Sequence, residues 1–159
     1  MSEEKRLNRV LIVDDHPTVR EGLAHRLALE NDFLKCGEAA DADDALPRIA
    51  EELPDVVVVD ISLHGGTGID LIKRVKAEFP SVRILAWSMH DESLCAERAL
   101  RAGALGYIDK AQSTDRVVEA IRCVLAGNVF VSGQVAERLL QRSVRAHTPE
   151  LQSPAEVLS

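Results

Sequence analysis

The chain has 159 residues, 46% of them hydrophobic and only 3% aromatic, with a formal net charge of -7 at pH 7. This length and composition fit one compact domain with a core of Val, Leu, Ile and Ala, and the negative charge argues against binding a nucleic-acid backbone, which needs clustered Lys and Arg. No apolar run approaches the roughly 20 residues that span a bilayer, and the polar start lacks the apolar segment of a secretion signal, so we expect a cytoplasmic protein with no membrane partner.

Short apolar runs alternate along the chain with amphipathic segments of helical length. We expect strands at 10–13, 34–40, 56–59, 83–87 and 106–108, and helices at 18–29, 43–51, 68–78, 92–102 and 114–126. This alternation is typical of βαβ units, so the predicted fold class is α/β, with a doubly wound, five-stranded parallel sheet. The four valines at 56–59 show no polar alternation, which predicts a central strand covered on both faces.

The chain changes character after residue 126. Gly127 and Asn128 are typical of a helix end, a short apolar run follows, and one more amphipathic helix is predicted by the spacing of Val135, Leu139, Leu140 and Val144. The last residues contain two prolines and no periodicity. We therefore expect a domain over 7–126, a linker strand and helix over 127–146, and a flexible linker over 147–159.

Acidic, hydroxyl and basic side chains follow four of the predicted strands. Asp14 and Asp15 follow the first strand, Asp60 the third, Ser88 the fourth and Lys110 the fifth. Because the carboxyl ends of parallel strands meet at one edge of a sheet, where ligands bind, we expect these side chains to form one site. Asp14 or Asp15 alone could instead cap the next helix, but a cap explains neither the second acid nor Asp60.

Three carboxylates and an ammonium suit a magnesium ion and a phosphoryl group. Mg²⁺ takes one or two carboxylates plus phosphate oxygens, and its charge offsets the repulsion between Asp14 and Asp15. Because aspartate has an unperturbed pKa of about 3.9, Asp60 can attack a phosphorus centre without a general base and become an aspartyl phosphate. Lys110 would then balance charge on the phosphoryl oxygens.

At these residues the chain resembles the receiver domain of bacterial two-component response regulators. The resemblance covers nearly all of residues 8–126 and rests on Asp14 with Asp15, on Asp60 after four valines, on Ser88, and on the segment 103–110. The local sequences Asp-Asp-His-Pro, Ser-Met-His-Asp-Glu and Gly-Asn-Val-Phe-Val-Ser are most similar to the LuxR/NarL/FixJ-type subfamily, whose members carry a C-terminal helix-turn-helix domain.

The resemblance implies a signalling switch rather than an enzyme. Asp60 would accept a phosphoryl group from a sensor histidine kinase, with the domain promoting its own phosphorylation and dephosphorylation. A phosphorylation-dependent homodimer would then control transcription, with DNA bound only through a C-terminal domain absent from this sequence. The resemblance places Mg²⁺ on Asp14, Asp15, Asp60 and the backbone carbonyl of Ser62. It gives the phosphoryl-contacting and switch roles to Lys110, Ser88 and Tyr107.

Several alternatives stay open at this point. A phosphatase with an aspartyl nucleophile would show two acids separated by one residue, and a nucleotide- or flavin-binding domain would show a glycine- or hydroxyl-rich loop after the first strand. Tyr107 could simply pack, and Ser88 could only satisfy a backbone group. His16 could lie beside the site as a proton donor or serve only the local turn. Ala111 stands where many receivers have proline, which leaves the geometry of the preceding peptide bond open.

Overall fold

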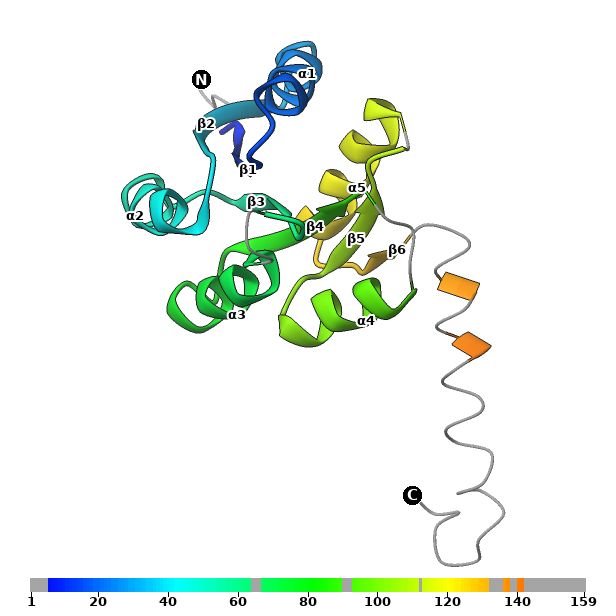
Figure 1. Cartoon of the computed structure of the whole chain (residues 1–159). Helices are drawn as coiled ribbons and strands as arrows, with labels where there is room; N and C mark the ends of the chain where they lie inside the picture. The colour runs from blue at the N-terminus through cyan, green and yellow to red at the C-terminus, as the bar shows by residue number, and fades with distance from the viewer. Residues whose placement is uncertain are drawn as a thin grey trace, which may run out of the picture.

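A parallel β-sheet lies between two layers of helices (Figure 1). The computed structural model describes residues 6–63, 67–89, 93–111, 113–131, 136–137 and 140–141. On one face lie α1 (Pro17–Ala28) and α5 (Thr114–Leu125). On the other face lie α2 (Ala42–Glu52), α3 (Gly68–Glu78) and α4 (Ser93–Ala102). In the described part of the chain, no helix is long and apolar enough to cross a membrane.

The sheet has the strand order β2-β1-β3-β4-β5-β6, with every neighbouring pair parallel. Its strands are β1 (Asn8–Val13), β2 (Phe33–Ala39), β3 (Val56–Asp60), β4 (Arg83–Ser88), β5 (Gly106–Asp109) and β6 (Phe130–Val131). The chain order reverses direction between β1 and β3, so the carboxyl ends of these two strands open onto a crevice where side chains can meet. The predicted doubly wound α/β architecture is confirmed.

The central strand β3 divides the core into two parts. All five of its residues are buried, as the run of valines predicts. Because successive side chains of a strand point to opposite faces, Val57 and Val59 pack in the cluster under α2, α3 and α4, whereas Val56 and Val58 pack in the cluster under α1 and α5. Each fully buried valine contributes about 1.5–3 kcal/mol from burial, so the predicted position of this strand rests on a strong driving force.

The five predicted strands are present, and the structure adds a sixth. Phe130 and Val131 form β6, which pairs with β5 through the register Gly106 to Phe130 and Tyr107 to Val131. Two residues are too few to show an alternating pattern, which is why the sequence indicated only a linker strand here. The sheet therefore extends past residue 126.

Most of the predicted C-terminal helix lies outside the described residues, as does the predicted linker at 147–159. Residues 136–137 and 140–141 are helical. The domain boundaries proposed from the sequence stay predictions. Within the described residues there is no cis peptide bond, and this includes the bond between Lys110 and Ala111.

Helix α2 has contrasting ends. At its start the side chain of Asp41 accepts a hydrogen bond of 2.8 Å from the backbone N–H of Asp44, a normal N-cap. At its end Leu53 adopts a left-handed conformation with φ of 45°, and 61% of the residue is exposed. Glycine usually occupies such a position because it has no Cβ to clash with the backbone.

Candidate functional site

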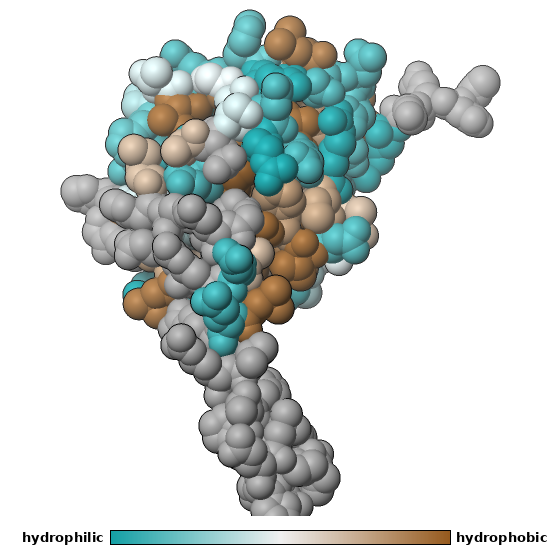
Figure 2. All heavy atoms as spheres, turned by 90° about the vertical axis from the view of Figure 1, so that its right-hand side faces the viewer, coloured by the Kyte–Doolittle hydropathy of each residue, from teal (hydrophilic) through white to brown (hydrophobic). Residues whose placement is uncertain are grey.

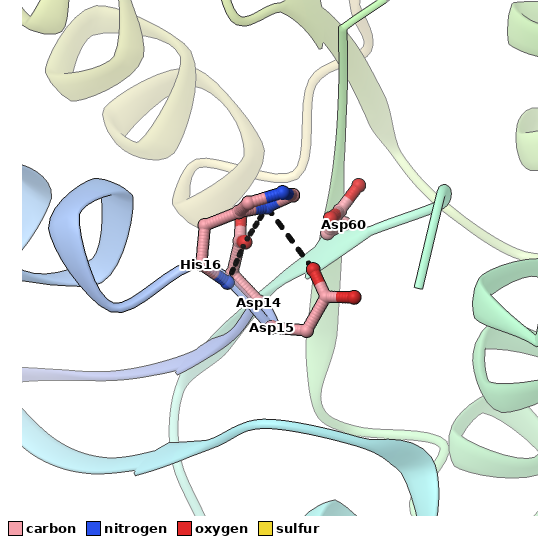
Figure 3. A group of neighbouring side chains, drawn as sticks. All are labelled: Asp14, Asp15, His16 and Asp60. Atoms are coloured by element: carbon pink, nitrogen blue, oxygen red, sulfur yellow. Dashed lines mark hydrogen bonds and ion pairs between the residues drawn. The ribbon is translucent and has the colours of Figure 1, made fainter. Parts of the chain in front are cut away.

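The predicted site residues meet at the carboxyl edge of the sheet. Asp60 is the last residue of β3, and Ser88 is the last residue of β4. Asp14 and Asp15 follow β1 directly, and Lys110 follows β5. Ligand atoms of Asp14, Asp15 and Asp60 lie, with one from His16, within 4.8 Å of one another (Figure 3). The structure thus brings together the acids that the sequence places on separate strands.

Lys110 lies against two of these carboxylates. Its ammonium Nζ is 2.6 Å from Oδ2 of Asp14 and 3.1 Å from Oδ2 of Asp60. Asp14 and Asp60 are fully buried, and the Lys110 side chain is only 5% exposed. Charges this far from water interact much more strongly than surface ion pairs, so the contact holds the three groups in place.

The acidic cluster suits a divalent cation. Three carboxylates face one ammonium, so negative charge is in excess. Among the described residues, one carboxylate oxygen each of Asp14, Asp15 and Asp60 is buried without a hydrogen bond of normal geometry. Each of these oxygens has only an ion-pair contact, with Lys110 or with His16, and carboxylate oxygens are the ligands that Mg²⁺ prefers. The residues present therefore fit the metal that the sequence predicts.

Asp60 is subject to opposing influences. Burial raises the pKa of its carboxyl group above the ordinary value, and the nearby Asp14 carboxylate acts in the same direction. The backbone N–H of Ser62, which donates to Oδ1 of Asp60 at 2.8 Å, and the Lys110 ammonium oppose this rise in pKa. The two oxygens of Asp60 are therefore held differently, one by a backbone donor and the other beside the ammonium.

The His16 side chain contacts the acids, which a role in the local turn alone would not require. Its Nδ1 is 3.0 Å from Oδ1 of Asp14 and 3.0 Å from Oδ1 of Asp15 (Figure 3). Its backbone N–H also donates to Oδ1 of Asp14 at 2.8 Å. His16 is itself the N-cap of α1 and makes no side-chain capping bond, so neither aspartate is the N-cap.

Arg20 is a residue that sequence reasoning missed. From α1 it donates a hydrogen bond to the backbone carbonyl of Asp14, and its Nε donates to Glu38 of β2 at 2.8 Å. Glu38 also accepts from Lys35, and together the two cations lower the pKa of Glu38, Lys35 having the larger effect. Arg20 thus ties the segment that carries Asp14 to two elements. An arginine on a helix is usually solvated, so no sequence signal marked it.

Ser88 ends β4 at the carboxyl edge, whereas Tyr107 lies further inside the sheet, where it pairs with Ala86. Ser88 is fully buried, and its backbone carbonyl accepts a 2.6 Å hydrogen bond from the N–H of Lys110. Tyr107 is fully buried in the cluster that also contains Ala96 and Ala99 of α4. The structure therefore places Tyr107 inside the core rather than at the surface. Switch roles for both residues stay predictions.

Gly68 brings α3 close to the acidic cluster. A Cβ atom at this position would lie 2.4 Å from Cα of Ile61 and 2.5 Å from the backbone oxygen of Asp60. Both neighbours are backbone atoms, which cannot rotate away. A side chain at residue 68 would therefore push α3 away from the end of β3.

Comparison with known proteins identifies similar sequences and structures. The response regulator receiver domain family matches residues 10–122. The transcriptional activator protein ExaE of Pseudomonas putida is 39% identical over 130 residues, which are 82% of this chain and 61% of ExaE. The response regulator GacA of Pseudomonas protegens is 33% identical over 151 residues, which are 95% of this chain and 70% of GacA.

A solved structure shows the same arrangement. The crystal structure of a LuxR-family two-component response regulator from Aurantimonas sp. SI85-9A1 superposes with a TM-score of 0.82 and 36% sequence identity. The superposition covers 87% of this chain and 99% of that one. The chain spans about two thirds of the length of its curated relatives, 61% of the first and 70% of the second.

Proposed function

Because the chain belongs to the response regulator receiver domain family, we propose that it is a phosphorylation-driven signalling switch with Asp60 as its phosphoryl acceptor. The family is regulatory and is not classed among enzymes. The observation that carries the assignment of Asp60 is its position at the end of β3, buried, 3.1 Å from the Lys110 ammonium and grouped with Asp14 and Asp15. The proposed location of the reaction in the cell is the cytoplasm.

The proposed reaction moves a phosphoryl group from a phosphohistidine of a sensor kinase to Asp60. A carboxylate oxygen of Asp60 forms a bond to phosphorus, and the phosphorus–nitrogen bond of the donor breaks. The electron pair of that bond stays on the imidazole nitrogen of the donor. Lys110 lies where its ammonium can balance charge on the transferred oxygens, because it already contacts the acceptor carboxylate.

The carboxylates of Asp14, Asp15 and Asp60 would hold Mg²⁺ at this site. The family resemblance adds the backbone carbonyl of Ser62 as a fourth oxygen donor. When bound, the ion supplies positive charge for the phosphoryl oxygens. Because Asp14 and Asp60 are buried, little water is available to stabilise the charge of the phosphoryl oxygens. With this arrangement the domain would also promote transfer from small acyl phosphates and the later hydrolysis of its own aspartyl phosphate.

Ser88 and Tyr107 would relay the change to the surface. A new dianion on Asp60 attracts the Ser88 hydroxyl, and a shift of Ser88 changes the space available to the Tyr107 ring. The affected surface is that of α4, β5 and α5. We propose that this surface then pairs two copies of the protein. The similar protein ExaE is named as a transcriptional activator, so the proposed output is control of transcription through a C-terminal DNA-binding domain outside this sequence.

Intact-mass spectrometry tests the assignment of the acceptor. The chain is incubated with Mg²⁺ and acetyl phosphate, and the wild-type protein should gain one phosphoryl group. Asp60→Asn should abolish the gain, because the amide is nearly isosteric with the carboxylate but is not a nucleophile. Asp70→Asn, which changes an exposed acid on α3, serves as the matched control and should label normally. Labelling of Asp60→Asn at the wild-type rate would contradict the assignment.

A further inference from the structure

The ring of Trp87 faces the ammonium of Lys110. The distance from Nζ of Lys110 to the ring centroid is 5.2 Å. Both side chains are withdrawn from water, since Trp87 is 4% exposed and the Lys110 side chain 5% exposed. The face of an indole ring carries negative potential, and its attraction for a cation is strongest when the pair is desolvated. Trp87 therefore stabilises the position of the Lys110 ammonium in addition to the carboxylates.

Directional bonds contribute little to holding this ammonium. Its contacts with Asp14 and Asp60 are short, yet Nζ makes no hydrogen bond of normal geometry with the described residues. The two ion pairs hold the ammonium near both carboxylates. The ring of Trp87 adds a further restraint, because displacement of Nζ away from the ring face weakens the attraction.

Packing alone does not account for a tryptophan at this position. The indole N–H of Trp87 is buried and has no hydrogen-bond partner among the described residues. A buried donor without an acceptor destabilises the fold, whereas phenylalanine would fill apolar space without that penalty. Indole is also the aromatic ring that attracts cations most strongly. The unpartnered N–H therefore suits a residue whose role is to present the face of its indole ring to the Lys110 ammonium.

The backbone of Trp87 is also tied to the acceptor strand. Trp87 is the register partner of Asp60, and its carbonyl oxygen accepts a 3.0 Å hydrogen bond from the N–H of Ile61. The side chain meanwhile belongs to the core cluster under α1 and α5, with Val117 and Ile121 of α5. One residue thus contacts the residue next to the acceptor, the ammonium and the α5 layer.

We propose that Trp87 is a positioning residue for phosphoryl transfer, whose ring face holds the Lys110 ammonium beside Asp60. This inference rests on the proposed function of Asp60. In the transfer step, a carboxylate oxygen of Asp60 bonds to phosphorus as the bond from phosphorus to the donor oxygen or nitrogen breaks. Trp87 touches none of these atoms and acts only through Lys110.

The rate constant for labelling by acetyl phosphate, at saturating Mg²⁺ and followed by intact mass, tests the inference. Trp87→Leu keeps apolar volume but removes the ring, and should slow labelling about tenfold. Trp87→Phe keeps a weaker ring and should fall between Leu and wild type. Leu85→Val is the matched control, because Leu85 lies in the same strand and the same core cluster without an assigned contact to Lys110, and it should label at the wild-type rate.

A double-mutant cycle separates positioning from a structural effect. In a Lys110→Met background, Trp87→Leu should have almost no further effect on the labelling rate, because the residue through which it acts is gone. An equal slowing of about tenfold in both backgrounds would overturn the inference, as would equal rates for Trp87→Leu and wild type. Wild-type protein that gains no phosphoryl group would instead refute the proposed function, so the two failures are distinguishable.

Fluorescence gives a measurement that does not depend on the folding of Trp87→Leu. Trp87 is the only tryptophan in the chain, so tryptophan emission reports the surroundings of this one ring, of which the Lys110 ammonium is a part. Lys110→Met should change the emission intensity or wavelength of Trp87. Arg98→Met, which removes an exposed cation on α4, should leave the emission unchanged. Unchanged emission in folded Lys110→Met protein would overturn the inference.

Discussion

Asp15 differs from its two acidic neighbours in exposure. Asp14 and Asp60 are fully buried, whereas the side chain of Asp15 is 29% exposed and faces a cavity of about 500 Å³ that Asp41, Asp43 and Thr67 also line. A carboxylate that is both near the buried pair and open to a cavity is the one that an incoming cation meets first. Its charge also repels Asp14 and Asp60 when no cation is bound.

Asp15→Ala should therefore weaken Mg²⁺ binding by about 10–100-fold, a range typical for perturbing a metal site. Removal of one repelling charge should also stabilise the metal-free protein, by roughly 3 kcal/mol per repelling pair at an effective dielectric constant near 20. A Mg²⁺ titration followed by Trp87 fluorescence, together with urea denaturation, measures both effects. Asp43→Ala removes an exposed acid from the same cavity and should change Mg²⁺ affinity little. Equal affinity in Asp15→Ala and wild type would refute the ligand role.

Leu53 carries backbone strain that a glycine would relieve. Its φ of 45° lies in the left-handed region, and its side chain is mostly exposed, so little packing is lost on removal. A left-handed conformation costs a non-glycine residue about 1–2 kcal/mol. Glycine avoids this cost, but the greater flexibility of glycine in the unfolded state cancels part of the gain. Leu53→Gly should raise the free energy of unfolding by about 0.5–1 kcal/mol. Leu53→Ala should show no such gain, and equal stability of the two variants in urea would contradict the account.

At the scale of elements, the sequence predicted the strands and helices that are stabilised by burial of a continuous or periodic run of apolar residues. Four consecutive valines predicted the buried strand β3. The acids at strand ends predicted one site, because the carboxyl ends of parallel strands lie at the same edge of a sheet. The two residues of β6 carry no periodic signal. The same limit applies to Arg20, whose role depends on the distance between α1 and the carbonyl of Asp14, a quantity that no local pattern encodes. For His16, the sequence showed only that it follows Asp14 and Asp15, and this left its role open.

The junction between β3 and α3 depends on Gly68. Gly68→Ala should lower the free energy of unfolding by about 2–3 kcal/mol, because the new Cβ meets backbone atoms of Asp60 and Ile61. It should also slow labelling of Asp60. Gly22→Ala is the matched control, since a Cβ in this part of α1 meets nothing within 4 Å, and helix propensity should stabilise it by about 1 kcal/mol. Similar effects of the two substitutions in urea denaturation would contradict the steric explanation.

The connection between α1 and β2 through Glu38 should depend on pH. The pKa of Glu38 is lowered by its hydrogen bonds to Lys35 and Arg20, so the unfolded state binds the proton more readily than the folded state. The stabilisation is therefore fully present above the ordinary glutamate value of 4.5 and is lost as the pH falls through the lower folded-state pKa.

Glu38→Gln should accordingly reduce stability at pH 7 by about 1 kcal/mol. The difference from wild type should shrink as the pH is lowered below the ordinary glutamate value. Urea denaturation across this pH range measures the effect. Glu51→Gln, which changes an exposed acid of α2, should show no such pH dependence. A difference that grows on acidification would have the wrong sign and would refute the assignment.

At the scale of the whole molecule, ion pairs join the region of α1 to α5, whereas two apolar side chains are exposed near α4. Between α1 and α5, Arg122 pairs with Glu30 and Asp32, and Arg26 pairs with Glu30 and Asp115. These arginines lower the pKa of Glu30. By contrast, Met89 after β4 and Leu94 in α4 are 60% and 53% exposed. On the side that α4, α5 and β6 form, hydrophilic residues dominate the upper part of the view and hydrophobic residues gather below (Figure 2).

The exposed apolar side chains of Met89 and Leu94 make the α4 side the expected surface for self-association. With beryllofluoride and Mg²⁺, which mimic the phosphorylated state, the sedimentation coefficient should shift from monomer to dimer. Leu94→Ser should weaken the dimer, because an exposed apolar side chain would be covered on association. Leu29→Ser, which changes a 65% exposed leucine at the end of α1, is the matched control and should leave association unchanged. An unchanged monomer at high concentration would contradict the prediction.

The short strand β6 attaches the chain to both halves of the core at once. Val131 packs against the cluster that contains Tyr107, and Phe130 packs against the cluster that contains Trp87. Strand β6 is thus anchored in both core layers, so a rearrangement of either layer would apply a force to the same two residues. Val131 is also the register partner of Tyr107. A displacement of the Tyr107 backbone would therefore act directly on Val131, the last residue of β6. The position of β6 therefore depends on the packing of both faces of the sheet.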